Sequence, residues 1–303
     1  MFIYIENKEL LSKIISYLDY INKSYTLDIN SEYEYVLIAD INKKSIEISK
    51  NKKVILITYL FEKKIYKSFI KNNKQNREFK NRLINCINKF NKVIVSIDYI
   101  KELLEDKTST EIITINKELP SINIGNTKYL YDIYKIKKRR KNILFIDFEY
   151  EGLENINVLA LKYPKLNFLY LGFKPYYNMT KKEKKIYDNL PPNIYKIKYY
   201  DINIFCDILK LSDIVINESN ILFDINYLYS ILILKKKFLS KNIIYKNLLD
   251  NKHIYMYENQ KELILKFSKI FEERLADISI NGYDYVVNNT FFQIAKKYSI
   301  YLP

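Results

Sequence analysis

Short apolar runs rich in Ile, Val, Leu and Tyr alternate along the chain with segments whose apolar residues repeat at helical spacing. The runs are typical of buried β-strands, and the spacing between them predicts amphipathic helices. Such strand–helix alternation predicts parallel sheets with helices on both faces. Strands are expected at 1–6, 35–40, 53–60, 92–97 and 111–116, and further on at 142–148, 166–173, 190–200, 213–217, 237–240 and 253–257.

The alternation is interrupted between residues 117 and 141, a stretch of weak periodicity that ends in the basic run KIKKRRK at 135–141. We therefore expect two doubly wound, Rossmann-like α/β domains with parallel sheets. The first spans 1–130, a basic linker follows at 131–141, and the second spans 142–283. Ligands of this class of fold bind beyond the carboxyl ends of the strands and between domains.

One His, two separate Cys and four scattered Gly in 303 residues exclude several kinds of chemistry. A single His rules out His-rich metal sites, and Cys86 and Cys206 lack the spacing of a zinc or iron–sulfur site. Unclustered Gly residues exclude a Walker A loop and a GxGxxG fingerprint. We expect no metal and no cofactor. The first residues do not resemble a signal peptide, and no apolar run is long enough to cross a membrane, which favours a cytoplasmic protein.

Lys and Arg outnumber Asp and Glu by 50 to 35, which gives a formal charge of +15. This balance favours an anionic partner: a membrane surface, nucleic acid or a phosphorylated substrate. The abundance of Lys, Asn, Ile and Tyr is also what an AT-rich genome produces, so the charge alone selects no partner. The Lys-rich segments 61–74 and 180–189 fit an anionic membrane surface as well as a solvated helix face. Nucleic acid is the least favoured partner, because no module that binds it is recognisable.

The stretch 167–219 resembles family 4 glycosyltransferases, in particular the Firmicute branch of diacylglycerol glucosyltransferases. In that branch an aromatic-Gly turn precedes a Lys-rich helix, a Leu-Pro-Asn turn, and a strand that ends in Pro-Ser. The corresponding residues here are Gly172-Phe173, 181–188, Leu190 to Asn193, and Glu218-Ser219. The stretch 67–107 resembles the acceptor-binding domain of the same branch. The resemblance covers most of the chain in order.

The resemblance implies the GT-B fold, in which two Rossmann-like domains face each other across a cleft. It also implies that a final helix, 284–303, packs back on the first domain. The implied activity is transfer of a hexose from a nucleotide sugar to a membrane lipid or glycan. Enzymes of this kind work without a metal and stabilise the departing diphosphate with Arg, Lys and a helix N-terminus.

Several functional residues of the family are not matched in this chain. The Gly-rich loop after the first strand is replaced by IENKELLSK at 5–13. A carboxylate replaces the cation of the diphosphate-binding turn and should repel the ligand by about a few kcal/mol. The matching positions are Ile57 and Tyr59 for the family's His, Glu149 to Gly152 for the diphosphate-binding turn, and Leu222 and Ser230 for its paired Glu residues.

The alignment nevertheless defines a candidate donor site, although it singles out no catalytic residue. The structural alternative is that the Glu residues stabilise a helix N-terminus, Gly172 forms a left-handed turn, and Ser219 with Asn220 caps a helix. The donor-side candidates are Glu151, Gly152, Gly172, Phe173, Lys174, Glu218, Ser219, Asn220 and Asp224, and the acceptor-side candidate is Tyr59.

Three functional hypotheses follow. The first is a degenerate family 4 glycosyltransferase with weak or no activity. The second is a non-catalytic partner or scaffold of an active transferase, which the missing His, Lys and paired Glu residues favour. The third is a basic nucleic-acid-binding protein. Binding of a nucleotide sugar separates the first from the second, and a steep salt dependence of oligonucleotide binding identifies the third.

Overall fold

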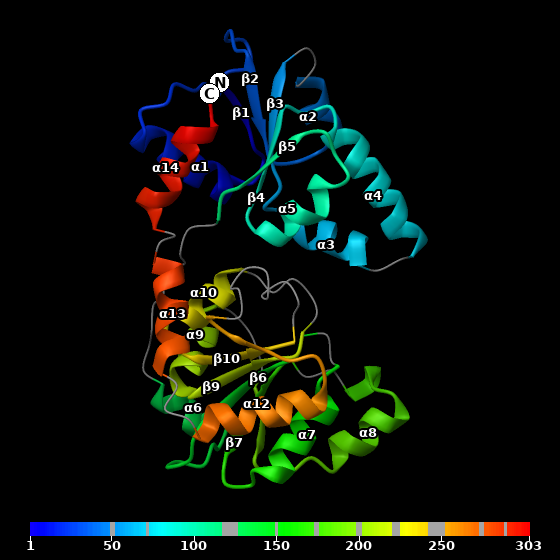
Figure 1. Cartoon of the computed structure of the whole chain (residues 1–303), viewed down its shortest axis with the longest axis vertical. Helices are drawn as coiled ribbons and strands as arrows, with labels where there is room; N and C mark the ends of the chain where they lie inside the picture. Colours follow the sequence, from blue (N-terminus) through cyan, green and yellow to red (C-terminus); the bar gives the residue numbers. More distant parts are fainter. Residues whose placement is uncertain are drawn as a thin grey trace. The chain divides into compact units, whose positions relative to one another are not determined.

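The structure is a computed structural model, which describes residues 1–48, 52–70, 73–116, 127–148, 151–172, 176–197, 202–219, 225–241, 252–272, 276–287 and 290–303. The chain divides into two compact units. The first unit comprises Met1–Glu118 together with Asn288–Pro303, and the second unit comprises Leu119–Val287. The chain therefore begins and ends in the first unit, where the two termini lie close together (Figure 1).

The first unit is built on a parallel sheet whose strands follow one another in chain order, from β1 to β5. Most of the strand residues are Ile, Val and Leu, whose branched side chains pack well on a pleated surface. The strands are β1 (Phe2–Tyr4), β2 (Tyr35–Ile38), β3 (Lys53–Ile57), β4 (Lys92–Val95) and β5 (Glu111–Thr114). The helices are α1 (Lys8–Tyr20), α2 (Lys43–Ile48), α3 (Glu62–Ile70), α4 (Lys74–Ile87), α5 (Asp98–Glu105) and α14 (Phe291–Tyr301).

Helices α1 and α14 pack against each other on one side of this sheet, and α3, α4 and α5 lie on the other (Figure 1). Leu18 of α1 and Ile294 of α14 are buried in one cluster with alternate strand residues such as Leu37 and Ile55. Lys23 donates a hydrogen bond to the carbonyl oxygen of Leu302 (3.1 Å). Residues from the far end of the chain thus complete the core of the first unit.

The second unit contains a parallel sheet of different order, β11-β10-β9-β6-β7-β8. Its strands are β6 (Asn142–Ile146), β7 (Asn167–Leu171), β8 (Ile194–Ile197), β9 (Ile214–Asn217), β10 (Lys237–Ser240) and β11 (Tyr255–Met256). Its helical elements are α6 (Lys128–Ile133), α7 (Leu153–Lys162), the 3₁₀ helix η1 (Tyr176–Asn178), α8 (Lys181–Asp188), α9 (Ile202–Leu211), α10 (Ile225–Ile233), α12 (Gln260–Glu272) and α13 (Ala276–Val287).

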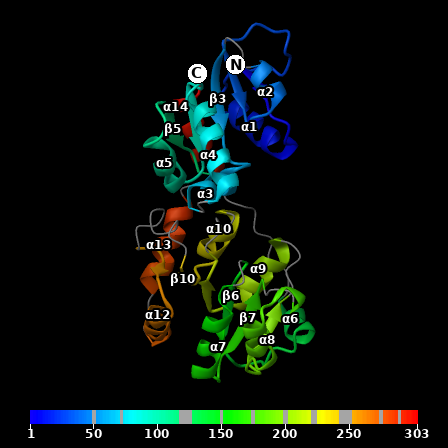
Figure 2. The same ribbon diagram turned by 90° about the vertical axis from the view of Figure 1, so that its right-hand side faces the viewer.

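Several aromatic residues contribute to the core on one face of this sheet. Phe145, Phe168 and Tyr170 from the strands form a buried cluster with Phe267 of α12 and with apolar residues of α7. Burying a large apolar side chain of this kind contributes about 1.5–3 kcal/mol. Helix α9 lies on the opposite side of the strands from α12 (Figure 2).

The fold class expected from the sequence is confirmed, since both units have parallel sheets with helices on both faces. The expected strands are all present, and Thr180 and Glu183 form the capping box of α8. The final helix expected at 284–303 is divided between α13 and α14, and of these two helices α14 belongs to the first unit. The weakly periodic region 117–141 contains α6, whose six residues are too few to show a helical period.

Candidate functional site

The strand order of the second unit places a topological switch point between β6 and β9. From β6 the chain continues to β7 and β8 on one side, whereas after β9 it continues to β10 and β11 on the other. Ligands of such sheets bind at the carboxyl ends of the two central strands, because the connections diverge there and leave a crevice. The candidate site therefore consists of the residues that directly follow β6 and β9, together with the start of α7.

Asp147 directly follows β6 and holds the N-terminus of α7. Its Oδ1 accepts a hydrogen bond from the backbone N–H of Glu151 (3.0 Å), and its Oδ2 accepts one from the N–H of Gly152 (2.9 Å). The side chain is fully buried. The carboxylate thus holds the turn that leads into α7, whose N-cap residue Gly152 has no side-chain cap, and its charge interacts favourably with the helix dipole.

The hydroxyl group of Tyr170, on β7, also donates to Asp147 Oδ2 (2.9 Å). Burial raises the pKa of Tyr170, and the negative charge of Asp147 raises it further, so the phenol stays protonated and remains a donor. Three donors from two segments thus converge on one buried carboxylate, which satisfies a charge that would otherwise be costly in the interior.

Glu218 directly follows β9 and is also fully buried. Its Oε1 accepts a hydrogen bond from the side-chain amide of Asn155 on α7 (2.7 Å). That amide is held in turn by Gln260 of α12, whose Nε2 donates to Asn155 Oδ1 (2.8 Å). This chain of contacts ties β9, α7 and α12 together at the switch point.

The second oxygen of Glu218 is less well satisfied. Lys241, at the end of β10, places its ammonium group 3.9 Å from Oε2, but among the described residues no group donates a hydrogen bond to this oxygen. Burial raises the pKa of Glu218, and the charge of Asp147 adds to the rise. Asn155, the nearby Tyr257 hydroxyl and Lys241 oppose the rise without cancelling it. The carboxyl group is therefore easier to protonate than an exposed glutamate.

Gly152 permits the close packing of Glu218 on the start of α7. A Cβ atom on this residue would lie only 2.7 Å from Glu218 Cγ and 2.8 Å from Phe145 Cε1. Such contacts are far shorter than van der Waals separation, so any larger residue must push the carboxylate or the ring away. The absence of a side chain at this position is therefore explained by contacts inside the chain.

Two further candidates from the sequence contact the backbone of the segment that follows β6. The hydroxyl oxygen of Ser219 accepts a hydrogen bond from the backbone N–H of Phe148 (2.8 Å). Gly172 has a φ of +84°, in the region that favours glycine, and a Cβ there would lie 2.9 Å from the carbonyl oxygen of Asp147. The left-handed turn considered for Gly172 is present.

The structure brings five donor-side candidates from the sequence to this switch point: Glu151, Gly152, Gly172, Glu218 and Ser219. Their part in binding a ligand stays a prediction. Phe173, Lys174, Asn220 and Asp224 lie outside the described residues, as do Glu149 and Leu222.

The sequence analysis missed four residues that shape the site: Asp147, Asn155, Lys241 and Gln260. A signal was available for Asp147 and Lys241, because each directly follows a predicted strand, where functional groups of such sheets gather. Asn155 and Gln260 are 105 positions apart. Only the fold brings them into contact.

Tyr59, the acceptor-side candidate, belongs to the first unit. Its hydroxyl donates to the carbonyl oxygen of Ile115 and accepts a hydrogen bond from the hydroxyl of Tyr298 on α14 (3.2 Å). These contacts connect the ends of β3 and β5 with the last helix, which is sufficient to explain the residue structurally. Whether Tyr59 also meets an acceptor stays a prediction.

Among the described residues, no group of three or more His, Cys, Asp or Glu side chains is arranged to hold a metal ion. Within the same residues, no helix combines the length and the apolar character that crossing a bilayer requires.

No protein-family model and no curated protein matches the sequence. Several solved structures share its fold. The GtfA/B complex has a TM-score of 0.63 at 13% identity, covering 96% of this chain and 59% of that chain. Sucrose-phosphate synthase from Thermosynechococcus elongatus has a TM-score of 0.65 at 10% identity, with coverages of 98% and 79%. WaaG, a glycosyltransferase involved in lipopolysaccharide biosynthesis, has a TM-score of 0.61 at 11% identity, and both chains are covered completely.

These similarities show that the chain has the GT-B fold of glycosyltransferases, in agreement with the fold class expected from the sequence. The chain spans about three fifths of the GtfA/B chain that it matches (59%). At such low identity the likeness concerns the fold alone, and one fold supports many functions. The function must therefore be argued from the site.

Proposed function

We propose that this chain is a GT-B-fold protein that does not transfer sugar and instead acts as the non-catalytic partner of an active glycosyltransferase. The observation that carries the proposal is the buried carboxylate of Asp147. It accepts hydrogen bonds from the backbone N–H groups of Glu151 and Gly152, the two residues that precede α7. Asp147 therefore places a negative charge beside the start of a helix, the position at which a transferase of this fold would bind the diphosphate of the sugar nucleotide.

The charges at the switch point argue in the same direction. Transfer from a nucleotide sugar needs positive charge where the diphosphate leaves. Here the described residues provide two buried carboxylates, Asp147 and Glu218, with Lys241 as a cation beside the second. Bringing a like charge to within 4 Å of a carboxylate costs about 4 kcal/mol at an effective dielectric constant of about 20. A diphosphate at this position would have to meet this cost.

The partner role is supported by the kind of protein that shares the fold. One similar structure is a complex, GtfA/B. A chain that keeps the fold but places carboxylates at the donor position can serve as a non-catalytic member of such a complex. We therefore infer that the partner is a nucleotide-sugar-dependent transferase and that the nucleotide sugar binds to that partner.

We also propose that the pair works at the inner face of the membrane. The η1–α8 segment of the second unit carries Lys181, Lys182, Lys184 and Lys185, and Tyr177 beside them is 80% exposed. Lysine together with exposed tyrosine suits an anionic lipid surface, since the cations meet the headgroups and the ring enters the interface.

Reconstitution with the partner tests the proposal. The chain is affinity-purified under mild conditions from cells that express it, and proteins recovered in equimolar amount are identified. We expect a glycosyltransferase among them, and we expect its transfer rate to rise when the purified chain is added back at equimolar concentration. Sugar transfer or nucleotide-sugar hydrolysis by the chain alone would overturn the proposal and restore the enzyme hypothesis. Recovery of a transferase whose rate the chain does not alter would overturn the activating role.

A further inference from the structure

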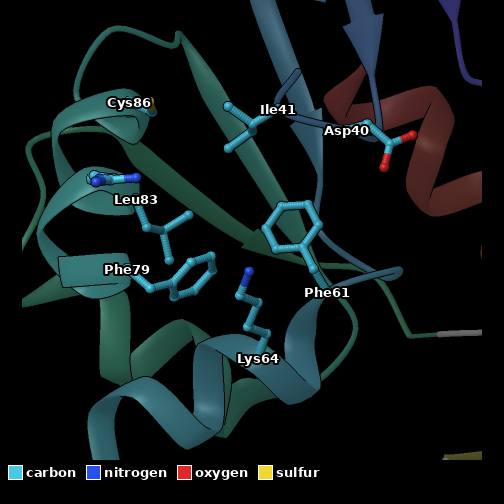
Figure 3. Close-up of a pocket in the computed structure, with 8 residues that line it drawn as sticks. Asp40, Ile41, Phe61, Lys64, Phe79, Leu83 and Cys86 are labelled. Carbon is cyan, nitrogen blue, oxygen red and sulfur yellow. The ribbon is translucent and has the colours of Figure 1, made fainter. Parts of the chain in front are cut away.

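A cavity of about 400 Å³ lies within the first unit, well away in sequence from the residues of the switch point. It is formed by the segment after β2, the start of α3 and one face of α4 (Figure 3). The residues of α4 that line it are Phe79, Arg82, Leu83 and Cys86, whose spacing of three and four places them on one side of the helix. The other lining residues are Asp40, Ile41, Phe61 and Lys64.

The side chains that line this cavity are mainly apolar, and two of them, Phe61 and Phe79, are aromatic. Figure 3 shows Phe61, Phe79, Ile41 and Leu83 with their side chains around the same space. Ligand-binding pockets in proteins measure about 300–1,000 Å³ and are lined in the same way, with a few polar groups that orient the ligand. The size and lining therefore fit a small molecule with a flat apolar body.

The polar groups at this cavity are mostly cationic. The Lys64 ammonium group lies 4.3 Å from the centre of the Phe79 ring, and Arg82 precedes the buried Leu83. Among the described residues neither Lys64 nor Arg82 forms an ion pair. Asp40 also lines the cavity, but its carboxylate points away from Lys64 (Figure 3). Two unpaired cations thus border an apolar space.

We propose that this cavity binds a small aromatic anion, an aryl phosphate or aryl carboxylate. The ring of the ligand packs against Phe61, Ile41 and Leu83, because the Lys64 ammonium group lies over the Phe79 ring on the side toward Phe61 (Figure 3). Offset or edge-to-face contacts with the Phe61 ring are favourable. The anionic group binds Lys64 and Arg82 through charge-assisted hydrogen bonds, which are the stronger kind. The proposal rests on residues of the first unit alone, so it does not depend on the partner role argued above.

Cys86 provides a reporter that belongs to the cavity itself. It is half-buried and lines the cavity, whereas Cys206, the other cysteine of the chain, lies buried in the second unit. Alkylation of Cys86 by iodoacetamide can be followed separately by mass spectrometry of the peptide that contains it. A molecule that fills the cavity must slow this reaction, because it covers the thiol.

The first measurement compares two probes of similar shape and different charge, phenyl phosphate and benzyl alcohol. We expect phenyl phosphate to slow the alkylation of Cys86 saturably by at least about tenfold. We expect benzyl alcohol to need a concentration at least about tenfold higher, the factor that loss of one modest interaction produces. Absence of protection by phenyl phosphate at millimolar concentration overturns the proposal, and equal protection by the two probes overturns the assigned role of the cations.

Charge variants of α3 and α4 complete the test. The double variant Lys64→Met with Arg82→Met should weaken protection by phenyl phosphate at least about tenfold and leave that by benzyl alcohol unchanged. The matched control, Lys74→Met with Arg77→Met, removes two exposed charges from α4 outside the cavity lining. It should bind phenyl phosphate as the unmodified chain does. If the control weakens protection as much as the cavity variant, general attraction by a basic chain explains the binding and the proposal fails.

Discussion

Each unit buries a glutamate at the carboxyl end of its parallel sheet. The two glutamates differ in how many of their carboxylate oxygens accept hydrogen bonds. In the first unit, Glu62 accepts hydrogen bonds on both oxygens, from Thr58 and from the backbone and side chain of Ser96. In the second unit, one oxygen of Glu218 is bound by Asn155, and burial raises the pKa of the group. Burial alone therefore does not mark a functional carboxylate.

The difference follows from topology. The strands of the first unit run in chain order without a reversal, so the polar groups after β3 and β4 can close on each other. The second unit reverses its strand order between β6 and β9, and its polar groups must bridge diverging segments. Asp147 accepts hydrogen bonds from the turn before α7 on both of its oxygens, whereas Glu218 is hydrogen-bonded to Asn155 on one oxygen. In sheets of this kind a ligand binds at the switch point. In this chain the carboxylates of Asp147 and Glu218 lie at that point.

Removing the Asp147 carboxylate should have the largest effect on stability. Asp147→Ala leaves two backbone N–H groups and the Tyr170 hydroxyl without their acceptor in a buried place. Unsatisfied buried donors cost about 1–3 kcal/mol each, so we expect a loss of about 3–5 kcal/mol in the free energy of unfolding by urea. The matched control is Asp188→Ala, which removes an exposed acceptor of Tyr176 and should cost less than about 1 kcal/mol. Similar losses in both variants would show that Asp147 is not the anchor of α7.

An isosteric change at Glu62 should come next. Glu62→Gln keeps the size of the side chain, and its Oε1 can still accept from Ser96 N–H while its amide donates to the Ser96 hydroxyl oxygen. We expect a loss of about 1.5 kcal/mol in urea unfolding, because hydrogen bonds to a charged carboxylate become weaker bonds to a neutral amide. Glu105→Gln, at an exposed i,i+4 ion pair with Lys101, serves as control and should change stability by less than about 0.5 kcal/mol.

Tyr59→Phe should have a smaller effect. It removes the hydroxyl that links Ile115 and Tyr298, and we expect a loss of about 1 kcal/mol in the unfolding free energy of the first unit. Tyr25→Phe, which loses only an exposed bond to Asp19, should be close to neutral. An unchanged stability of Tyr59→Phe would count against the structural explanation and return this residue to the acceptor-side candidates.

Glu218→Gln should change stability least, and its effect should depend on pH. Because the pKa of Glu218 is raised in the folded chain, folding binds a proton in the interval from the ordinary glutamate value of 4.5 up to the raised pKa. The unmodified chain therefore loses stability as pH rises through that interval, and the glutamine variant does not. We expect the melting temperatures of the unmodified chain and the variant to agree within a few degrees at about pH 5. Toward about pH 8 we expect the melting temperature of the variant to rise relative to that of the unmodified chain. A difference that is independent of pH would contradict the raised pKa.

The sequence was sufficient to predict the sheets, because their strands are apolar runs such as NILFI and NFLYL that can only be buried. It also provided Gly152, Gly172 and Glu218 as donor-side candidates, and the structure places them around the switch point. It did not reveal what these residues contact. The short polar side chain of Asp147 looks like the end of any strand, and its role depends on the turn that brings the N–H groups of Glu151 and Gly152 to it.

Charge was the least informative feature of the sequence. Glu149 and Glu151 drew attention as carboxylates at a diphosphate-binding turn, yet in the described structure Glu151 contributes its backbone N–H and Asp147 contributes the carboxylate. Sequence comparison could indicate that the turn had lost its cation. It could not indicate that Asp147 binds the turn before α7.

The central claim is that the donor position of the second unit is closed by the chain's own carboxylates, and calorimetric titration with UDP tests it most directly. The account predicts no saturable heat for the folded, unmodified chain up to a UDP concentration of about 1 mM, which corresponds to a binding free energy weaker than about −4 kcal/mol. Saturable binding of UDP with a Kd well below that concentration would contradict the account, because the diphosphate would then have displaced or bypassed Asp147 and Glu218.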